Sequence, residues 1–254
     1  PCDGVSCNDP PPPVCVDGTT SLTYSMPSYC EGGDCYYTEQ TSPCDYGCEN
    51  GVCVDDRGGL VAYYPFNGSA EDESGNDFHG TVFGASLTEG RNGLQDSAYS
   101  FDGIDDYIEL PSNLRGMSIT NSFTISVWIY VEDISGMYML LEDGTEYNTS
   151  TFYFGIRPRE QQVFARLNTA TTSYYNDDIA TASFVGQWTK FTYSYDGSTM
   201  RLYMNDNLFF SRGISGSIIN GNRNLRIGFP SGENYFRGVV DEVRISNIST
   251  TPES

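Results

Sequence analysis

Apolar and polar residues alternate along much of the chain after residue 57, with the two-residue period of a strand that buries one face. The clearest runs are residues 123–131, 162–167 and 200–204, in which every second side chain is apolar. Gly, Asn and Asp separate many short runs of this kind, and no stretch has the period of an amphipathic helix. The pattern predicts an all-β domain made of two antiparallel sheets.

The first 56 residues have a different character, because they hold every cysteine of the chain and few large apolar residues. A segment this small cannot rest on a hydrophobic core alone, so we expect disulfide bonds to hold it together. Polar residues 55–59 mark a boundary, which predicts a disulfide-rich module at 1–56 and a β-sandwich at 57–254. The cysteines are Cys2, Cys7, Cys15, Cys30, Cys35, Cys44, Cys48 and Cys53.

Two of the cysteine pairs have the spacing of a short hairpin. Cys48 and Cys53 flank a central Asn-Gly pair, and Cys30 and Cys35 flank a central Gly-Gly pair. A two-residue turn places such cysteines opposite each other and close enough to bond, although either pair could bond to other strands instead. Zinc is the alternative, but the module contains no histidine and its cysteine spacings lie at the edge of the usual zinc range.

The charge of the chain excludes several classes of partner. Its 34 acidic and 13 basic residues give a formal net charge of −21. Nucleic-acid binding requires basic residues that displace phosphate counterions, and anionic membranes would repel this protein. No run is apolar enough to insert into a membrane. Lys190 is the only lysine, and an acidic surface with so little lysine is typical of halophilic proteins as well as of acidic secreted ones.

Several short motifs follow one another in a fixed order along residues 59–66, 72–76, 99–110, 123–129, 188–193, 201–205 and 236–245. Together they resemble the laminin G-like, or concanavalin A-like, jelly-roll family, and the resemblance covers nearly all of residues 59–248. It implies a two-sheet antiparallel jelly-roll sandwich, on which lectins, adhesins, enzymes and spacers are all built. The adjoining cysteine module is similar to modules of microbial extracellular proteins.

Acidic clusters in the loops between these motifs favour a site for a hard cation, most plausibly calcium. In the last predicted strand Asp241 alternates in step with Val239, Val243 and Ile245, so we expect its side chain to point into the core. A buried carboxylate without a partner is costly, and a calcium ion would compensate it. The alternative is that Asp241 caps backbone amides.

The family resemblance implies a structural calcium ion that joins an early loop to the last strand. Oxygen donors in that loop would come from Asp72 and Asn76, and Asp102 or nearby carbonyl groups would complete the shell around the ion. The predicted metal ligands are therefore Asp72, Asn76, Asp102 and Asp241.

Catalysis is not expected. His79 is the only histidine, and no nucleophile motif accompanies it, so a serine or cysteine triad has no support. A glycosidase needs two carboxylates that face each other across a cleft, and the acidic Gly-containing turn at residues 142–146 does not provide them. We expect His79 to be a turn residue near the metal site, because calcium prefers oxygen ligands.

Residues 143–178 and the loop at 232–235 combine tyrosines with charged side chains, a mixture that suits sugar rings. The alternative is that these tyrosines simply cover the sandwich surface. Three Asn-x-Ser/Thr patterns also mark potential N-glycosylation sites. The candidate ligand-binding residues are Tyr147, Tyr174, Tyr175, Asp177 and Tyr235, and the glycosylation candidates are Asn67, Asn148 and Asn247.

Together these features predict a non-enzymatic, calcium-stabilised extracellular module of a prokaryotic surface protein. Its partner would be a glycan or a cell-surface glycoprotein, which it would bind in adhesion or recognition. The alternative is a structural subunit or spacer of a surface filament or sheath, in which copies of the chain contact each other. Because the chain starts at Pro1, we expect it to be a processed piece of an exported protein.

Overall fold

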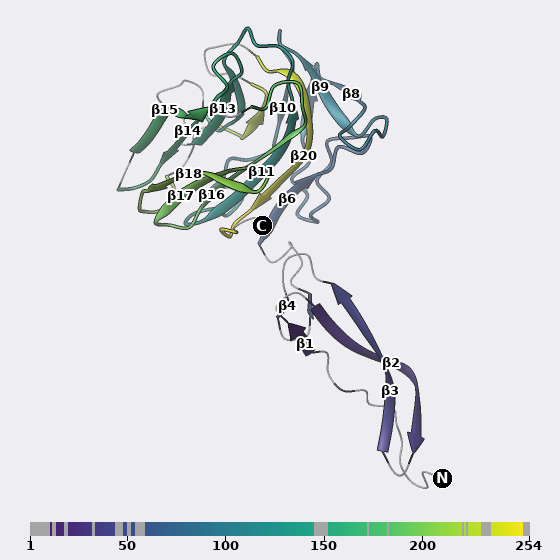
Figure 1. Ribbon diagram of the computed structural model, residues 1–254. Coiled ribbons are helices and arrows are strands. Elements are labelled where there is room, and N and C mark those ends of the chain that lie inside the picture. Colours follow the sequence, from purple (N-terminus) through teal and green to yellow (C-terminus); the bar gives the residue numbers. More distant parts are fainter. Residues whose placement is uncertain are drawn as a thin grey trace. The chain divides into compact units, whose positions relative to one another are not determined.

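The computed structural model shows an all-β protein, as the alternation of apolar residues predicted (Figure 1). Among the described residues no helix occurs, and so no helix is long and apolar enough to cross a membrane. The chain divides into two compact units, Pro1–Gly58 and Gly59–Ser254. The structure describes residues 11, 14–17, 20–31, 34–43, 48–49, 52–53, 59–144, 152–171, 173–181, 183–219, 221, 223–229 and 235–250.

The first unit contains a three-stranded antiparallel sheet and a separate short hairpin. The sheet has the order β1-β2-β3, with β1 (Val14–Asp17), β2 (Thr20–Glu31) and β3 (Asp34–Pro43). The hairpin pairs β4 (Cys48–Glu49) with β5 (Val52–Cys53).

Both predicted cysteine hairpins are present in the backbone register. Cys30 lies opposite Cys35 at the end of the β2–β3 ladder, and Cys48 lies opposite Cys53 in the β4–β5 pair. Cys35 is disulfide-bonded. The complete set of four disulfides stays a prediction, because Cys2, Cys7 and Cys44 lie outside the described residues and the side chains of Cys15, Cys30, Cys48 and Cys53 are not described.

The second unit is a sandwich of two antiparallel sheets (Figure 1). One sheet has seven strands in the order β15-β14-β13-β12-β19-β10-β7. The other has eight strands in the order β18-β17-β16-β11-β20-β9-β8, with β6 paired to β20. The bounds are β6 (Leu60–Tyr64), β7 (Thr81–Phe83), β8 (Ser86–Thr88), β9 (Ala98–Asp102), β10 (Tyr107–Glu109), β11 (Phe123–Tyr130), β12 (Tyr138–Glu142), β13 (Phe152–Arg157), β14 (Gln162–Asn168), β15 (Ser173–Thr181), β16 (Thr189–Tyr195), β17 (Thr199–Met204), β18 (Asn207–Gly213), β19 (Arg226–Ile227) and β20 (Arg237–Ser246).

One continuous apolar core is built from side chains of both sheets. The predicted alternation is clear in β11, where Phe123, Val127 and the other odd-numbered residues belong to the core. The Phe123 ring makes edge contacts with the rings of Phe152 and Tyr193, at centroid distances of 5.6 and 5.1 Å. Aromatic pairs of this kind add to the free energy gained by burying their area. The core therefore gives the sandwich a source of stability other than disulfide bonds.

The last strand departs from a simple alternation, because β20 carries a β-bulge against β11. Asp241 pairs with Trp128, and two further residues of β20, 242 and 243, then face a single residue of β11. Glu242 has a φ of 45° at this point. The bulge reverses the order of inward and outward side chains. Val240 and Val243 therefore lie in the core, whereas Asp241 lies on the outer face beside Trp128.

The prediction that Asp241 points into the core with its neighbours is thus wrong. It assumed an uninterrupted period of two through the last strand, and one extra residue in a strand moves the side chains that follow to the opposite face. Asp241 is nevertheless buried, with a relative exposure of 6%, because loop residues cover it from outside the sandwich.

The turn between β16 and β17 gives a pH-dependent prediction. The Asp196 carboxylate accepts hydrogen bonds from the Ser198 and Thr199 N–H groups, at 2.9 and 2.7 Å, and from the Arg201 guanidinium, at 2.6 Å. Burial raises the pKa of Asp196, but these hydrogen bonds outweigh burial and hold the pKa well below its usual range. Its stabilising effect is therefore present above a pH of about 3.9 and is lost as the pH falls through the lowered value.

We expect Asp196→Asn to have a lower melting temperature than the wild type at pH 7, and the difference to shrink below about pH 4. Thermal unfolding at pH 7, 4 and 2.5 measures this difference. Glu160→Gln is the matched control, because Glu160 is exposed. A difference for Asp196→Asn that stays constant down to pH 2.5 would contradict the assignment of the charge effect to this carboxylate.

Candidate functional site

The outer face of the seven-stranded sheet carries a row of polar and aromatic residues. The neighbours of this row along each strand, such as Ile108, Leu141 and Phe154, belong to the core, so the row itself lies on the other face. The strand register brings together one residue from every strand of the sheet. From one edge to the other they are Tyr175, Arg166, Tyr153, Glu142, Arg226, Glu109 and Thr81.

Exposure differs along the described residues of this row. In the middle of the sheet Tyr153 and Glu142 have relative exposures of 0% and 2%. At the β7–β10–β19 end, by contrast, Phe83 is 40% exposed and the Glu109 side chain is 28% exposed. Among the described residues, the β7–β10–β19 end therefore offers side chains that a ligand can contact.

Four aromatic rings form a contiguous group at that end, which we call the aromatic platform: Phe83, Tyr107, Phe229 and Tyr235. Phe83 and Tyr107 are cross-strand partners whose rings stack at 4.4 Å with an interplanar angle of 11°. Tyr107 meets Phe229 edge-on at 5.0 Å, and Phe229 meets Tyr235 edge-on at 5.4 Å. Because each ring is fixed by the next, the platform presents aromatic area without a large loss of side-chain entropy on binding.

An ion pair lies within the platform. The Arg226 guanidinium lies 4.3 Å from the Phe229 ring centroid, and its Nε atom donates a hydrogen bond to Glu109 at 2.7 Å. The Nη1 atom of Arg226 is buried and has no hydrogen-bond acceptor among the described residues. Asn224 Nδ2 lies 3.5 Å from the second oxygen of Glu109. The platform thus combines apolar ring faces with fixed donors and acceptors, the combination that suits a sugar ring.

The structure separates the ligand-binding residues predicted from the sequence. Tyr235 belongs to the aromatic platform, whereas Tyr174, Tyr175 and Asp177 lie on β15, at the opposite edge of the same sheet. The side chains of these three β15 residues are not described, and Tyr147 lies outside the described residues.

The sequence analysis missed Phe83, Tyr107, Glu109, Arg226 and Phe229. They come from three short strands and a following loop that are far apart in the chain. The only local signal was an aromatic residue at the edge of a polar loop, such as Tyr107 after two aspartates, and many surface tyrosines share that signal.

The first predicted metal ligand, Asp72, is fully engaged by protein donors. Its Oδ1 atom accepts hydrogen bonds from the N–H groups of Tyr63 and Ser74, at 2.8 and 2.9 Å. Its Oδ2 atom accepts from the Ser74 hydroxyl at 2.9 Å and from the Phe78 N–H at 3.0 Å. Asn76 uses its Nδ2 atom to donate to the Val61 carbonyl at 3.0 Å. These two residues hold their own loop against β6.

Asp241 has a cationic protein partner. Its Oδ2 atom accepts a hydrogen bond from the Arg91 N–H at 3.1 Å and lies 3.8 Å from the Arg91 Nε atom. Burial raises the pKa of Asp241, and the Arg91 N–H and guanidinium act in the opposite direction. The sequence analysis gave as an alternative that Asp241 caps backbone amides, and the hydrogen bond from the Arg91 N–H is a contact of that kind.

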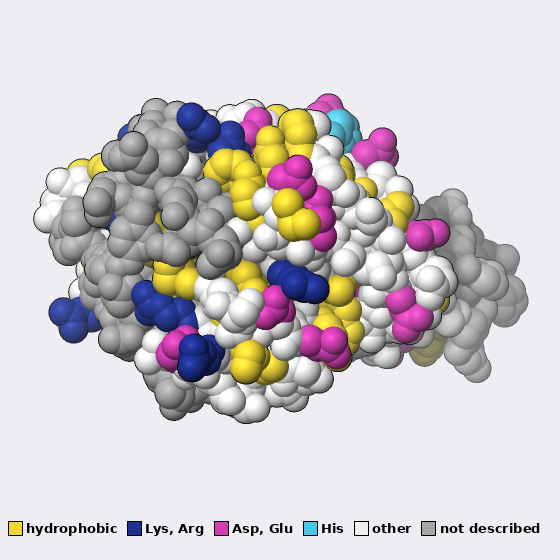
Figure 2. Space-filling model, turned by 90° about the horizontal axis from the view of Figure 1, so that it is seen from above, with side chains coloured by type: hydrophobic (Ala, Val, Ile, Leu, Met, Phe, Trp, Pro, Cys, Tyr) yellow, Lys and Arg dark blue, Asp and Glu magenta, His cyan; other side chains and the backbone are white. Residues whose placement is uncertain are grey.

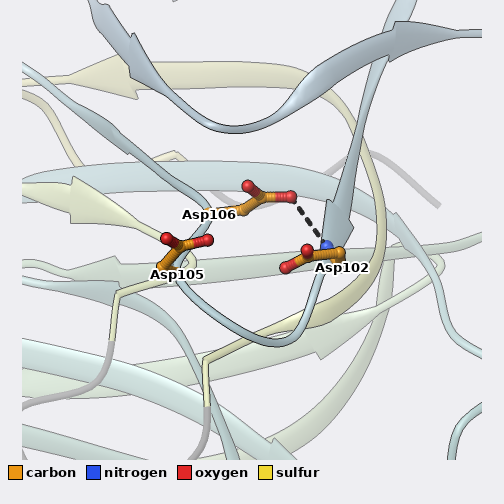
Figure 3. A group of neighbouring side chains, drawn as sticks. All are labelled: Asp102, Asp105 and Asp106. Carbon is orange, nitrogen blue, oxygen red and sulfur yellow. Dashed lines mark hydrogen bonds between the residues drawn. The ribbon is translucent and has the colours of Figure 1, made fainter.

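The remaining predicted ligand, Asp102, belongs to a separate cluster of carboxylates. Carboxylate oxygens of Asp102, Asp105 and Asp106 lie within 4.8 Å of one another in the loop between β9 and β10 (Figure 3). Asp106 Oδ2 accepts a hydrogen bond from the Asp102 N–H at 2.8 Å, and Asp102 Oδ1 accepts one from the Ile104 N–H, also at 2.8 Å. Burial raises the pKa of Asp106; the hydrogen bond from Asp102 opposes this shift, and the neighbouring carboxylates add to it.

The four predicted ligands do not fit one shared calcium ion. Among the described residues, neither Asp72 nor Asp241 belongs to a cluster of three or more metal-ligating acidic, histidine or cysteine side chains. The carboxylate oxygens of Asp72 are occupied by N–H and O–H donors, and Asp241 faces a guanidinium. Calcium binding by this chain stays a prediction, and the described geometry gives it no common centre.

His79 is a turn residue in contact with the Asp72 loop. Its Nδ1 atom accepts a hydrogen bond from the Asp72 N–H at 3.1 Å, and its Nε2 atom lies 3.7 Å from Asp77. Figure 2 shows the single histidine at the surface between acidic side chains. The glycosylation candidates Asn67 and Asn247 are exposed, and Asn148 lies outside the described residues.

Comparisons with known proteins identify the fold and the family. No match was found among curated proteins. Among solved structures, domain 4 of AbnA, a GH43 extracellular arabinanase from Geobacillus stearothermophilus, in complex with arabinotriose, is similar with a TM-score of 0.62 and 22% identity, over 76% of this chain and 95% of that domain.

Two toxin domains have the same fold at lower identity. The binding domain of Paraclostridial Mosquitocidal Protein 1 matches with a TM-score of 0.61 and 15% identity, over 77% of this chain and 50% of that one. The receptor-binding domain of botulinum neurotoxin C/D mosaic serotype matches with a TM-score of 0.58 and 14% identity, over 77% and 49%. This chain therefore spans about half the length of these toxin domains.

A family match extends over most of the sandwich. Residues 102–254 match a laminin G-like family model described as the concanavalin A-like lectin/glucanases superfamily. These residues include β10 to β20, and thus most strands of both sheets. The chain belongs to the concanavalin A-like lectin/glucanase superfamily.

Proposed function

We propose that this chain is a non-catalytic extracellular module of a prokaryotic surface protein, and that it binds glycans through the aromatic platform. The observation that carries this proposal is the platform itself, four contiguous rings of which two, Tyr107 and Phe229, lie against the Arg226 guanidinium that pairs with Glu109. Sugar rings have apolar faces that stack on aromatic rings and hydroxyl groups that need fixed hydrogen-bond partners. The similar arabinanase domain was solved with arabinotriose, which supports a carbohydrate as the ligand class.

A binding role is favoured over hydrolysis by the state of the acidic residues on the same face. Hydrolysis of a glycosidic bond needs one carboxylic acid and one carboxylate, both free to reach the bond. Glu109 is ion-paired with Arg226, and Glu142 is buried in the middle of the sheet. An extracellular location is supported by the disulfide-bonded Cys35, because disulfides persist in oxidising compartments.

Substitutions in the platform test the proposal. On an array of plant and microbial glycans that includes arabino-oligosaccharides, we expect the wild type to bind, and Phe83→Ala and Tyr107→Ala each to weaken binding at least about tenfold. Tyr107→Phe keeps the ring and should keep most of the affinity. Tyr130→Ala is the matched control, because Tyr130 is a partly exposed tyrosine on the other sheet, in contact with Trp188 at 5.7 Å.

The alternative function, a subunit of a surface assembly, predicts the opposite results. It has one feature in its favour: β18 is an edge strand of the eight-stranded sheet and carries an exposed Leu208, so its main chain can pair with another copy. A blank array at millimolar glycan, together with self-association of the purified chain in analytical ultracentrifugation, would reject glycan binding in favour of this assembly role.

A further inference from the structure

The outer face of β20 holds two adjacent carboxylates, and both are reached by the same guanidinium. Arg91, in the loop between β8 and β9, contacts Asp241 and Glu242, which lie 150 and 151 residues further along the chain. We propose that Arg91 supplies the positive charge at this position in place of a metal ion, so that the sandwich is held closed without calcium.

The guanidinium is held from several directions. Its Nη2 atom makes a short ion pair with Glu242, and its Nε atom lies 3.8 Å from Asp241 Oδ2. The Arg91 guanidinium carbon lies 4.8 Å from the centroid of the Trp128 ring. An arginine held between carboxylates and an aromatic face is more strongly oriented than one in a single surface pair. Arg91 therefore acts as a fixed cation.

Glu242 also has a second guanidinium partner. The second oxygen of Glu242 accepts a hydrogen bond from Arg244 Nε at 3.0 Å, and the Arg244 guanidinium lies 4.3 Å from the Tyr63 ring centroid. Two carboxylates, Asp241 and Glu242, are thus matched by two guanidinium groups. A calcium ion would have to approach a carboxylate oxygen to about 2.3–2.6 Å, and the Arg91 guanidinium beside Asp241 and Glu242 would repel it.

The backbone around Arg91 is shaped for this contact. A Cβ atom at Gly90 would lie 2.4 Å from the Ser97 hydroxyl and 3.0 Å from Asp241 Oδ2. A side chain at position 90 would therefore push Asp241 away from the Arg91 N–H. The Gly90 N–H donates a hydrogen bond to the Leu94 carbonyl at 2.9 Å, so the backbone that carries Arg91 is held in a closed turn.

Thermal unfolding with and without chelator tests the proposal. We expect the same melting temperature in EDTA and in 1 mM calcium chloride for the wild type. Arg91→Met keeps the length of the side chain over Trp128 but removes the charge, and it should lower the melting temperature by about 4–8 °C. Lys190→Met is the matched control, because it removes a cation from a partly exposed ion pair with Asp206, in which Nζ lies 3.0 Å from the carboxylate, and it should cause a smaller fall.

A double-mutant cycle separates the charge from simple packing. Adding Asp241→Asn to Arg91→Met should restore at least half of the lost melting temperature, because the uncompensated carboxylate is then absent. If the fall in melting temperature of the double variant equals the sum of the falls of the two single variants, the proposal is overturned. So would an EDTA-dependent melting temperature in the wild type that disappears in Asp241→Asn. If Arg91→Met does not fold, the chelator comparison of the wild type and Asp241→Asn still decides the question.

Discussion

Replacing Asp72 by alanine is expected to lower the melting temperature of the sandwich by about 6–12 °C. The Asp72 carboxylate accepts four hydrogen bonds, three of them from the backbone N–H groups of Tyr63, Ser74 and Phe78. Hydrogen bonds to a charged acceptor are worth more than neutral ones, and the donors left behind lose their partner, which together costs about 3 kcal/mol. For a domain of this size, each kcal/mol corresponds to about 2–4 °C.

Two comparisons make the Asp72 experiment specific. Glu71→Ala is the matched control in the same loop, because Glu71 is exposed, and it should change the melting temperature little. Asp72→Asn keeps one carbonyl acceptor, and its melting temperature should lie between those of the wild type and Asp72→Ala. If Asp72 acts through hydrogen bonds, Asp72→Ala lowers the melting temperature by the same amount in EDTA as in calcium. A cost that is large in calcium and small in EDTA would instead identify Asp72 as a calcium ligand.

Reduction of the protein is expected to unfold the first unit and to leave the sandwich folded. Cysteines occur only up to Cys53, and the sandwich has its own continuous core. Each native disulfide in a small secreted module contributes about 2–5 kcal/mol, and a segment with so few large apolar residues has little hydrophobic core to hold it. Protease should then cleave within residues 1–58, while the remaining fragment keeps the melting temperature of the sandwich.

Peptide mapping without reduction provides the complementary measurement. We expect four disulfides within residues 1–56, with Cys30–Cys35 and Cys48–Cys53 as the pairs to test first, since each lies opposite its partner in a hairpin register. Free thiols, bound zinc, or a sandwich that melts earlier after reduction would each show that the first unit is not the separate disulfide-held module predicted here.

The fold was largely predictable because its signals are local. Alternation in residues 123–131 and 200–204 corresponds to β11 and β17, since a strand with one buried face imposes a period of two wherever it lies. The Asn-Gly and Gly-Gly pairs likewise predicted two hairpin registers correctly. The one clear error concerned Asp241. The bulge arises from the pairing of β20 with β11, and the sequence of β20 alone does not predict it.

The candidate site was much less predictable. Tyr235 was proposed as a ligand-binding residue, but its neighbours in the platform, such as Phe83 and Tyr107, were not. They meet because β7, β10 and β19 are adjacent in the sheet, although β19 is distant from the other two in sequence. The predicted metal ligands show the same limit of sequence analysis. The residue types suited to calcium were recognised, but the protein groups that donate hydrogen bonds to them were not.

The sequence by itself determined the division into a cysteine-rich segment and a cysteine-free sandwich, the all-β class, and the resemblance to a family that the match over residues 102–254 confirms. Tertiary structure alone decided which residues share a surface. It placed Arg91 against Asp241 and assembled the aromatic platform, because strand order and register depend on pairing between distant segments. Periodicity fixes which side chains a strand can bury, but only that pairing fixes which side chains become neighbours.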